Sequence, residues 1–351
     1  MNKDLDKAIN LHRKGLLEKA EKIYLEILNS DKKNSYILQL IGTLYLQKKN
    51  FKLSEKYLLN SLEQDPKNPG TLNNLGILKK NTKDFVKSLE YFELNIQKNN
   101  FLNSWVNKSN LLLENEKYKE GLDFSEKALR NFPKHPKILN NFAIFLFKCG
   151  FQHEAFKIYE KLDIENLHSE ESYINFCNLL IEINNLNLAL NIIDKLLFIN
   201  ENNLEGLRTR HYINKLLLKF DEAEKDLLKA LKIQESNFLT NKMLVELYID
   251  FKKFEKALSY CNLMITKGIE KDFFISKIII SKIYSGNWVS LSNDLIIFNE
   301  NLNHNNSHIN PLFLKYFNDD PLFQKKFSEN FWKNKYKNNY LAKLCLENKN
   351  K

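Results

Sequence analysis

The sequence predicts an all-α protein built from stacked helical hairpins, and three observations support this fold class. The chain has 351 residues, 43% of them apolar, which is enough to bury a substantial core. It has only 9 Gly and 6 Pro, too few turn-forming residues for a protein that needs a tight loop after every strand. The third observation is an internal repeat of 34 residues, a period typical of solenoids with one supersecondary unit per repeat.

Three similar five-residue segments define the register of the repeat, at residues 17–21, 220–224 and 254–258. When Ala20 is numbered position 20 of the first unit, that position recurs every 34 residues, with one step of 33 between Ser88 and Gly121. Position 20 is small in eight units, which read Ala20, Ser54, Ser88, Gly121, Ala155, Ala189, Ala223 and Ala257. Position 8 is small in the first six units, which read Ala8, Gly42, Gly76, Ser109, Ala143 and Cys177.

The sizes of the repeated residues indicate how each unit folds. Small residues at positions 8 and 20 let two helices approach closely, and large residues at positions 4, 17 and 24 fill the space between them. Prolines at the junctions between units cost little, because a missing N–H is tolerated there; these are Pro66, Pro69, Pro133 and Pro136. One hairpin alone could not cover its apolar face, so neighbouring hairpins are expected to stack into a superhelix.

This pattern, together with an aromatic or aliphatic residue at position 24 and proline at position 32, resembles the tetratricopeptide repeat. The resemblance covers residues 1–270 as about eight units and implies a right-handed superhelical solenoid of antiparallel helix hairpins with a helical C-terminal cap. Residues 271–300 keep the register through Gly286 and Trp288, and they are expected to form a modified capping helix pair. Residues 301–351 are expected to be a connector and a basic helical tail.

Net charge gives little support to a nucleic-acid or membrane partner. The formal charge is +10, but Lys and Asn number 49 each, a composition that AT-rich coding drift produces whatever the partner. The last 51 residues hold nine Lys against four acidic residues, so this segment carries half of the net positive charge. Residues 1–300 have the charge balance of an ordinary solvated surface. The hypothesis of a basic scaffold for nucleic acid or membranes is therefore supported only by the C-terminal tail.

Cysteine usage and the N-terminal sequence predict a cytoplasmic protein without metal or cofactor. The four cysteines, at 149, 177, 261 and 345, have no paired C-x-x-C spacing, which disfavours both a disulfide framework and a metal site. The first residues lack the basic-then-apolar pattern of a signal peptide, and no apolar run approaches the roughly 18 residues of a membrane span.

Residues that could suggest catalysis fall within the repeat pattern, so the chain by itself is not expected to be an enzyme. Cys177 and Cys261 lie at core positions and are expected to be buried thiols. His211 lies at position 8, where a tightly packed ring is expected, and His304 and His308 lie in an Asn-rich loop. No Gly-rich phosphate loop remains once the repeat glycines are explained.

The candidate binding residues are asparagines on the first helix of successive units, which lines the concave face of such a solenoid. Position 6 is Asn in four consecutive units, Asn74, Asn107, Asn141 and Asn175, and Asn110 and Asn178 lie at position 9 on a neighbouring stripe. An amide both donates and accepts hydrogen bonds, so this ladder could pair with the backbone of an extended peptide without reading its sequence. A hydrated stripe in an Asn-rich chain is the alternative.

A different inner surface, a clamp for a C-terminal carboxylate, is disfavoured. Arg208 and Lys242 lie at position 5 of successive units and could supply the charge. However, position 9 of those units holds Tyr212 and Glu246 in place of the asparagines that such a clamp needs.

The segment after the repeats carries a second resemblance. Ile309–Leu314 and Asn318–Lys326 contain two prolines and an acidic pair, which indicate turns into a helix with Asp319 or Asp320 as N-cap and Pro321 in its first turn. This sequence pattern, which follows a Gly-x-Trp capping pair, resembles the connector to the catalytic region in bacterial relatives of the O-linked N-acetylglucosamine protein transferase. The asparagine ladder at position 6 is also a feature of that family.

The resemblance implies a substrate-recognition part without its chemical part, because nothing in these 351 residues matches the family's nucleotide-sugar-binding catalytic half. The leading hypothesis is a protein–protein interaction module that binds extended polypeptide on its concave face. The alternative is a UDP-sugar-dependent protein glycosyltransferase that acts with a separate catalytic chain. A stand-alone adaptor, half of a split gene and a truncated frame all stay open.

Overall fold

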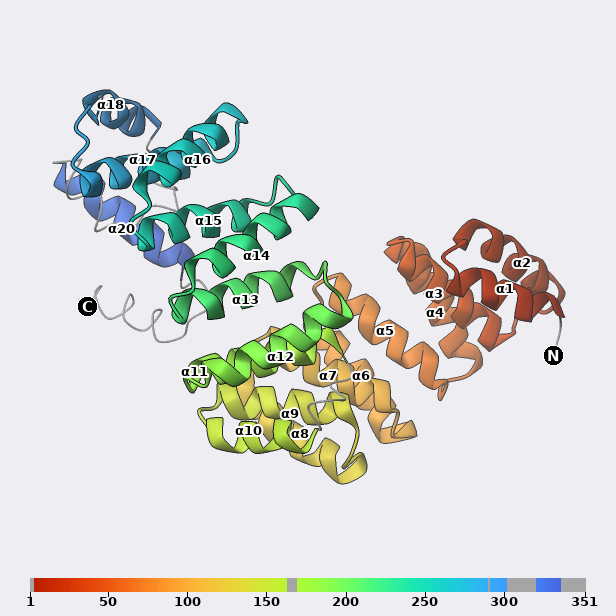
Figure 1. The fold of residues 1–351 in the computed structure, drawn as a ribbon. Coiled ribbons are helices and arrows are strands. Elements are labelled where there is room, and N and C mark those ends of the chain that lie inside the picture. The colour runs from red at the N-terminus through yellow and green to blue at the C-terminus, as the bar shows by residue number, and fades with distance from the viewer. Residues whose placement is uncertain (1–2, 163–168, 290, 302–319, 336–351) are drawn as a thin grey trace. The chain divides into compact units, whose positions relative to one another are not determined.

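The computed structural model describes residues 3–162, 169–289, 291–301 and 320–335, and the regular structure of these residues is entirely helical (Figure 1). The chain divides into two compact units, Met1–Ile183 and Asn184–Lys351. The all-α fold class predicted from the repeat is confirmed. The division falls inside the span for which the sequence predicts one solenoid, and the extent of that solenoid stays a prediction.

The N-terminal unit consists of consecutive helical hairpins whose helices occupy repeat positions of about 1–13 and 17–30. In chain order they are α1 (Lys3–Arg13), α2 (Leu17–Ser30), α3 (Ser35–Gln47), α4 (Phe51–Gln64), α5 (Pro69–Asn81), α6 (Phe85–Asn99), α7 (Leu102–Glu114), α8 (Tyr118–Asn131), α9 (Pro136–Lys148), α10 (Gln152–Lys161) and α11 (Glu170–Glu182). Each helix packs on the next, and the first helices α3, α5, α7, α9 and α11 also contact one another in succession. The predicted stacking of hairpins is therefore present here.

The C-terminal unit also consists of helices of which each, from α12 to α18, packs on the next. Its helices are α12 (Leu186–Ile199), α13 (Leu204–Leu216), α14 (Phe220–Ile233), α15 (Phe238–Asp250), α16 (Phe254–Thr266), α17 (Lys271–Ser285), α18 (Leu291–Asn301) and α20 (Pro321–Lys335). The helices α17 and α18 lie in the region for which the sequence predicts a modified capping pair, and their role as a cap stays a prediction.

The last described helix, α20, packs onto this pair. Phe327 of α20 is buried in a cluster with Ile275 and Ile279 of α17. The helix begins at Pro321, and the Asp320 carboxylate accepts a hydrogen bond from the backbone N–H of Leu322 at 2.9 Å. The predicted start of this helix is confirmed, whereas Asp319 lies outside the described residues.

Close approach of the helices depends on the small residues at positions 8 and 20. A Cβ built on Gly121 would lie 2.0 Å from the buried ring of Phe145, so only glycine fits without a shift of the ring. The hydroxyl of Ser54 at position 20 donates to the carbonyl oxygen of Gly42 at position 8, at 2.8 Å. Ser88 donates to Gly76 in the same way, also at 2.8 Å, so this contact repeats from one unit to the next.

The cysteine and histidine expected in the core are there. Cys177 and Cys261 are fully buried, and burial raises the pKa of Cys261 to about 12. His211 is buried with its Nδ1 3.2 Å from the carbonyl oxygen of Ala223, and burial lowers its pKa to about 4. These groups are packing residues, as the register predicts. The loop histidines and the last cysteine lie outside the described residues; they are His304, His308 and Cys345.

Within the described ranges, none of the helices has both the length and the apolar character that a bilayer crossing requires.

Candidate functional site

The candidate site is a stripe shared by five neighbouring first helices of the N-terminal unit. Positions 2, 6, 9 and 13 lie on one side of each helix, because they are spaced by four, three and four residues. All of them are partly or fully exposed except Asn141. We call this surface the first-helix face; its residues are Tyr36, Leu40, Thr43 and Gln47 on α3, Gly70, Asn74, Ile77 and Asn81 on α5, Asn103, Asn107, Asn110 and Glu114 on α7, Lys137, Asn141, Ile144 and Lys148 on α9, and Glu171, Asn175, Asn178 and Glu182 on α11.

Three of the four asparagines at position 6 link their hairpin to the preceding one. The Asn74 Nδ2 donates to the Thr43 hydroxyl at 2.7 Å. The Asn141 Nδ2 donates to the Asn110 Oδ1, also at 2.7 Å. In both cases position 6 meets position 9 of the unit before, so two residues of the predicted ladder, Asn141 and Asn110, bind each other.

Asn107 departs from this pattern because position 9 of the unit before it is Ile77, which cannot accept a hydrogen bond. Its Nδ2 donates instead to the Oδ1 of Asn73 at position 5, at 2.9 Å. The same oxygen accepts from the Ser104 hydroxyl at 3.2 Å, and Ser104 in turn accepts from the Asn95 Nδ2 at 2.8 Å. Asn107 is therefore held by a mostly buried polar network that joins α5, α6 and α7.

Asn175 is the one ladder residue whose amide nitrogen lacks a partner. Its Nδ2 is enclosed by the protein and makes no hydrogen bond within the described residues. The reason is again the preceding unit, where position 9 holds Ile144. The neighbouring amide at position 5, Asn140, already accepts from the Tyr159 hydroxyl at 3.1 Å. Asn178 is exposed on the next turn of α11.

These bonds leave part of each carboxamide available. An Asn side chain has two N–H donors and an oxygen with two lone pairs. Asn74 and Asn107 each use one N–H in the bond to the preceding hairpin, whereas Asn110 uses one lone pair to accept from Asn141. Asn74, Asn107 and Asn110 are partly exposed, so their remaining groups can reach a ligand. Asn141 is only 4% exposed, which limits it to holding the adjacent hairpins together. In the parts of the chain that the structure describes, no group of three or more His, Cys, Asp or Glu residues is arranged to hold a metal ion.

Comparisons with known proteins agree with this architecture. Residues 35–68, which span α3 and α4, match the family model of the tetratricopeptide repeat. A tetratricopeptide repeat protein from Parabacteroides merdae is similar in structure, with a TM-score of 0.55 and 18% identity over 70% of this chain and 97% of that one. The family match covers one helical hairpin of this chain, and the structural likeness extends over most of the rest.

The protein pilF of Pseudomonas aeruginosa is also similar in structure, with a TM-score of 0.51 and 16% identity over 60% of this chain and 97% of that one. At these identities the likeness shows the fold alone. A search of curated proteins gives no match. None of these findings bears on the glycosyltransferase resemblance, which stays a hypothesis.

Two residues that accept hydrogen bonds from the ladder asparagines are missing from the sequence-based set. Thr43 lies at position 9, in register with Asn110, and the register alone could have found it. Asn73 lies at position 5 and is buried, so only the geometry between neighbouring repeats shows that it orients Asn107.

Proposed function

We propose that this protein is a non-catalytic interaction module that binds extended polypeptide along the first-helix face. The observation that carries the proposal is the fixed orientation of the position-6 carboxamides, since Asn74 and Asn107 each donate a hydrogen bond to the preceding repeat. A side chain that is already ordered loses less conformational entropy when a ligand binds. Each of these amides therefore offers an oxygen and one N–H at little ordering cost.

The spacing of the repeats suits a peptide backbone. Neighbouring packed helices lie about 8–10 Å apart. An extended chain advances about 3.3 Å per residue, so each repeat faces about three residues of peptide. A carboxamide can pair with one peptide C=O and one peptide N–H. Binding through the backbone would make the face tolerant of sequence, with Ile77 and Ile144 offering apolar contact between the amides.

The affinity expected from these groups is low. If a carboxamide contributes about 0.5–1.5 kcal/mol net, the three accessible ones, Asn74, Asn107 and Asn110, contribute about 1.5–4.5 kcal/mol before ordering costs. By themselves these contributions correspond to a Kd of about 0.5 mM or weaker. A module of this kind would hold unstructured segments transiently.

Substitution of the accessible amides tests the proposal. The variant Asn74→Ala/Asn107→Ala should weaken the binding of fluorescent, unstructured peptides of about 12 residues by roughly tenfold, as measured by anisotropy. N-methylation of the peptide backbone should weaken binding to the parent by a similar factor, because it removes peptide N–H groups. The matched control Asn29→Ala/Asn60→Ala alters amides on the second helices α2 and α4 and should bind like the parent. Unchanged affinity in the first variant, with its helicity intact, would overturn the proposal.

A second candidate function is part of a UDP-sugar-dependent protein glycosyltransferase. The observation that favours it is α20, which begins at Asp320-Pro321 within the segment that resembles the connector of that family. In this case the first-helix face would present substrate to a separate catalytic chain in the cytoplasm. Isothermal titration of this chain with UDP-sugars tests for a nucleotide site on the chain itself: the interaction module should give no heat, and specific saturable heat would favour the enzyme.

A further inference from the structure

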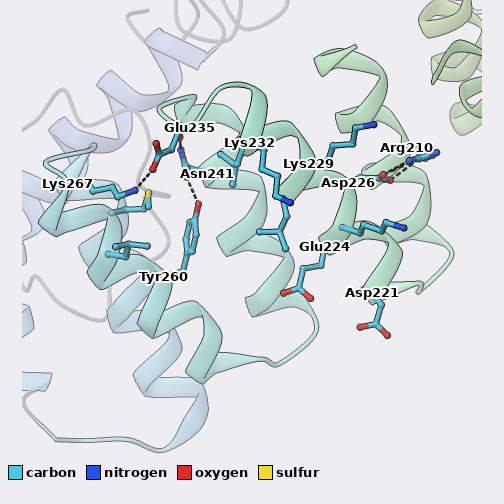
Figure 2. Close-up of a pocket in the computed structure, with 15 residues that line it drawn as sticks. Arg210, Asp221, Glu224, Asp226, Lys229, Lys232, Glu235, Asn241, Tyr260 and Lys267 are labelled. Carbon is cyan, nitrogen blue, oxygen red and sulfur yellow. Dashed lines mark hydrogen bonds and ion pairs between the residues drawn. The ribbon is translucent and has the colours of Figure 1, made fainter. Parts of the chain in front are cut away.

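We propose that a groove between α14 and α16 binds an amphipathic acidic segment of a partner protein. We call it the second-helix groove; it lies between the second helices of two neighbouring hairpins in the C-terminal unit (Figure 2). It does not include any residue of the first-helix face, so the proposal is independent of the function proposed above.

The second-helix groove is sizeable and its lining is partly apolar. Its volume is about 980 Å³. Buried Leu231 and Met264 line it, and the Tyr260 ring is held by a hydrogen bond from its hydroxyl to the Asn241 Oδ1 at 2.5 Å (Figure 2). A rigid floor of this kind is already ordered before a partner arrives.

Two leucines on opposite sides of the groove are exposed to solvent. Leu228 of α14 is 41% exposed and Leu263 of α16 is 46% exposed. Leucines exposed on both walls can receive the apolar side of an incoming helix, because packing between them would remove their side chains from water. A partner segment therefore needs an apolar stripe.

A row of lysines on α14 sets the charge of that segment. Lys225, Lys229 and Lys232 are spaced by four and three residues, so they lie on one side of the helix and line the groove. Lys229 is paired with Glu201 at 3.1 Å. Lys225 and Lys232 are exposed and have no carboxylate within 4.0 Å in the parts of the chain that the structure describes. Two lysines are thus available to pair with carboxylates from outside.

Carboxylates flank the lysine row. Asp221 and Glu224 precede it along α14, and Glu235 follows it. Glu224 is paired with Lys256 at 2.8 Å and Glu235 is paired with Lys267, so of these three carboxylates only Asp221 has no ion pair within the described residues. Because that charge lies at one end of the row, a short segment with carboxylates at its centre fits the groove better than a long continuous polyanion such as a nucleic acid.

The length of the site fits a short helix. The 14 residues of α14 extend over about 21 Å, so a partner helix of about 12–16 residues would match it. Its apolar residues, spaced by three or four, would lie over Leu228 and Leu263. Carboxylates beside that stripe would face Lys225 and Lys232. This is the helix-in-groove mode of recognition, here with an acidic partner.

The experiment uses the full chain and a designed fluorescein-labelled helical peptide of about 14 residues, with leucines on one side and glutamates flanking them at its centre. Anisotropy should show saturable binding to the parent. The variant Lys225→Glu/Lys232→Glu should bind this peptide about tenfold or more weakly and should bind a peptide with Lys in place of Glu more tightly than the parent does. The variant Leu228→Ser/Leu263→Ser should bind both peptides more weakly than the parent does.

The matched control is Lys32→Glu/Lys67→Glu, which makes the same change in net charge at exposed lysines of the N-terminal unit. It should bind the acidic peptide like the parent, and all variants should melt like the parent because their changed side chains are exposed. Absence of saturable binding to the parent would overturn the proposal. So would an equal loss in the control, or competition by single-stranded oligo-dT as effective as by unlabelled peptide.

Discussion

The same two repeat positions meet in both units of the molecule, but they carry different chemistry. In the N-terminal unit the carboxamide of Asn141 at position 6 donates to Asn110 at position 9 of the preceding repeat. In the C-terminal unit the ammonium of Lys277 at position 6 lies 3.4 Å from Glu246 at position 9. The repeat register determines which positions contact each other, and the residue types determine which hydrogen-bonding groups stay available to a ligand. An amide pair keeps donors and acceptors for a ligand, whereas an ion pair largely neutralises itself.

The C-terminal unit uses charge between its repeats at a second place, and more deeply. The Arg210 Nη2 donates to Asp226 at 2.6 Å, and its Nη1 donates to Asp194 at 2.8 Å, so one guanidinium joins α12, α13 and α14. Burial alone would lower the pKa of Arg210, but its hydrogen bonds to the two carboxylates raise it. Asp226 is only 3% exposed. The N-terminal unit also has a buried charge, since Lys108 is 7% exposed and is paired with Glu93, so the contrast between the units applies to positions 6 and 9 and not to all their contacts.

Removing the buried carboxylate is the largest expected effect. Asp226→Ala should lower the free energy of unfolding by about 3 kcal/mol, because it leaves the guanidinium and the Asn214 amide without their main acceptor. Chemical denaturation of the full chain measures this. The control Asp194→Ala should cost less than about 1 kcal/mol, because this partner is half exposed. Equal costs for the two variants would contradict the claim that burial of Asp226 makes it the main partner of Arg210.

The amide links should have smaller effects, and these should differ along the ladder. Asn141→Ala should lower the free energy of unfolding by about 1 kcal/mol, because it removes the bond to Asn110. Asn175→Ala should be close to neutral, because its Nδ2 has no hydrogen bond to lose within the described residues. Ile144→Thr should supply the missing acceptor, with a coupling of about 0.5–1 kcal/mol to Asn175 in a double-mutant cycle. A coupling of zero would show that positions 6 and 9 do not meet at this repeat.

The positions of the hairpins were predictable because they depend on residue size, which the sequence displays directly. Gly121 and Ala155 recur in register because two helices cross there, and a larger residue would collide. Pro321 and Asp320 predict a helix start for an equally local reason. Features of this kind depend on one or two turns of chain and on steric exclusion, so a single sequence reveals them.

The partners of the ladder residues were not predictable, because they depend on how one hairpin is rotated against the next. The periodicity places Asn107 on the correct stripe but does not show that Ile77 diverts its hydrogen bond to Asn73. The second-helix groove was missed for a related reason. A repeat identifies equivalent positions, whereas an opening between α14 and α16 depends on side chains from both helices.

The central claim is that the carboxamides of the first-helix face contact the backbone of a bound polypeptide. Side-chain amide NMR of the full chain measures this directly during titration with an unstructured peptide of about 12 residues. The signals of Asn74 and Asn107 should shift with a common saturation curve, and the signal of Asn29 on α2 should stay in place. Saturable binding that leaves the Asn74 and Asn107 signals unmoved would contradict the account.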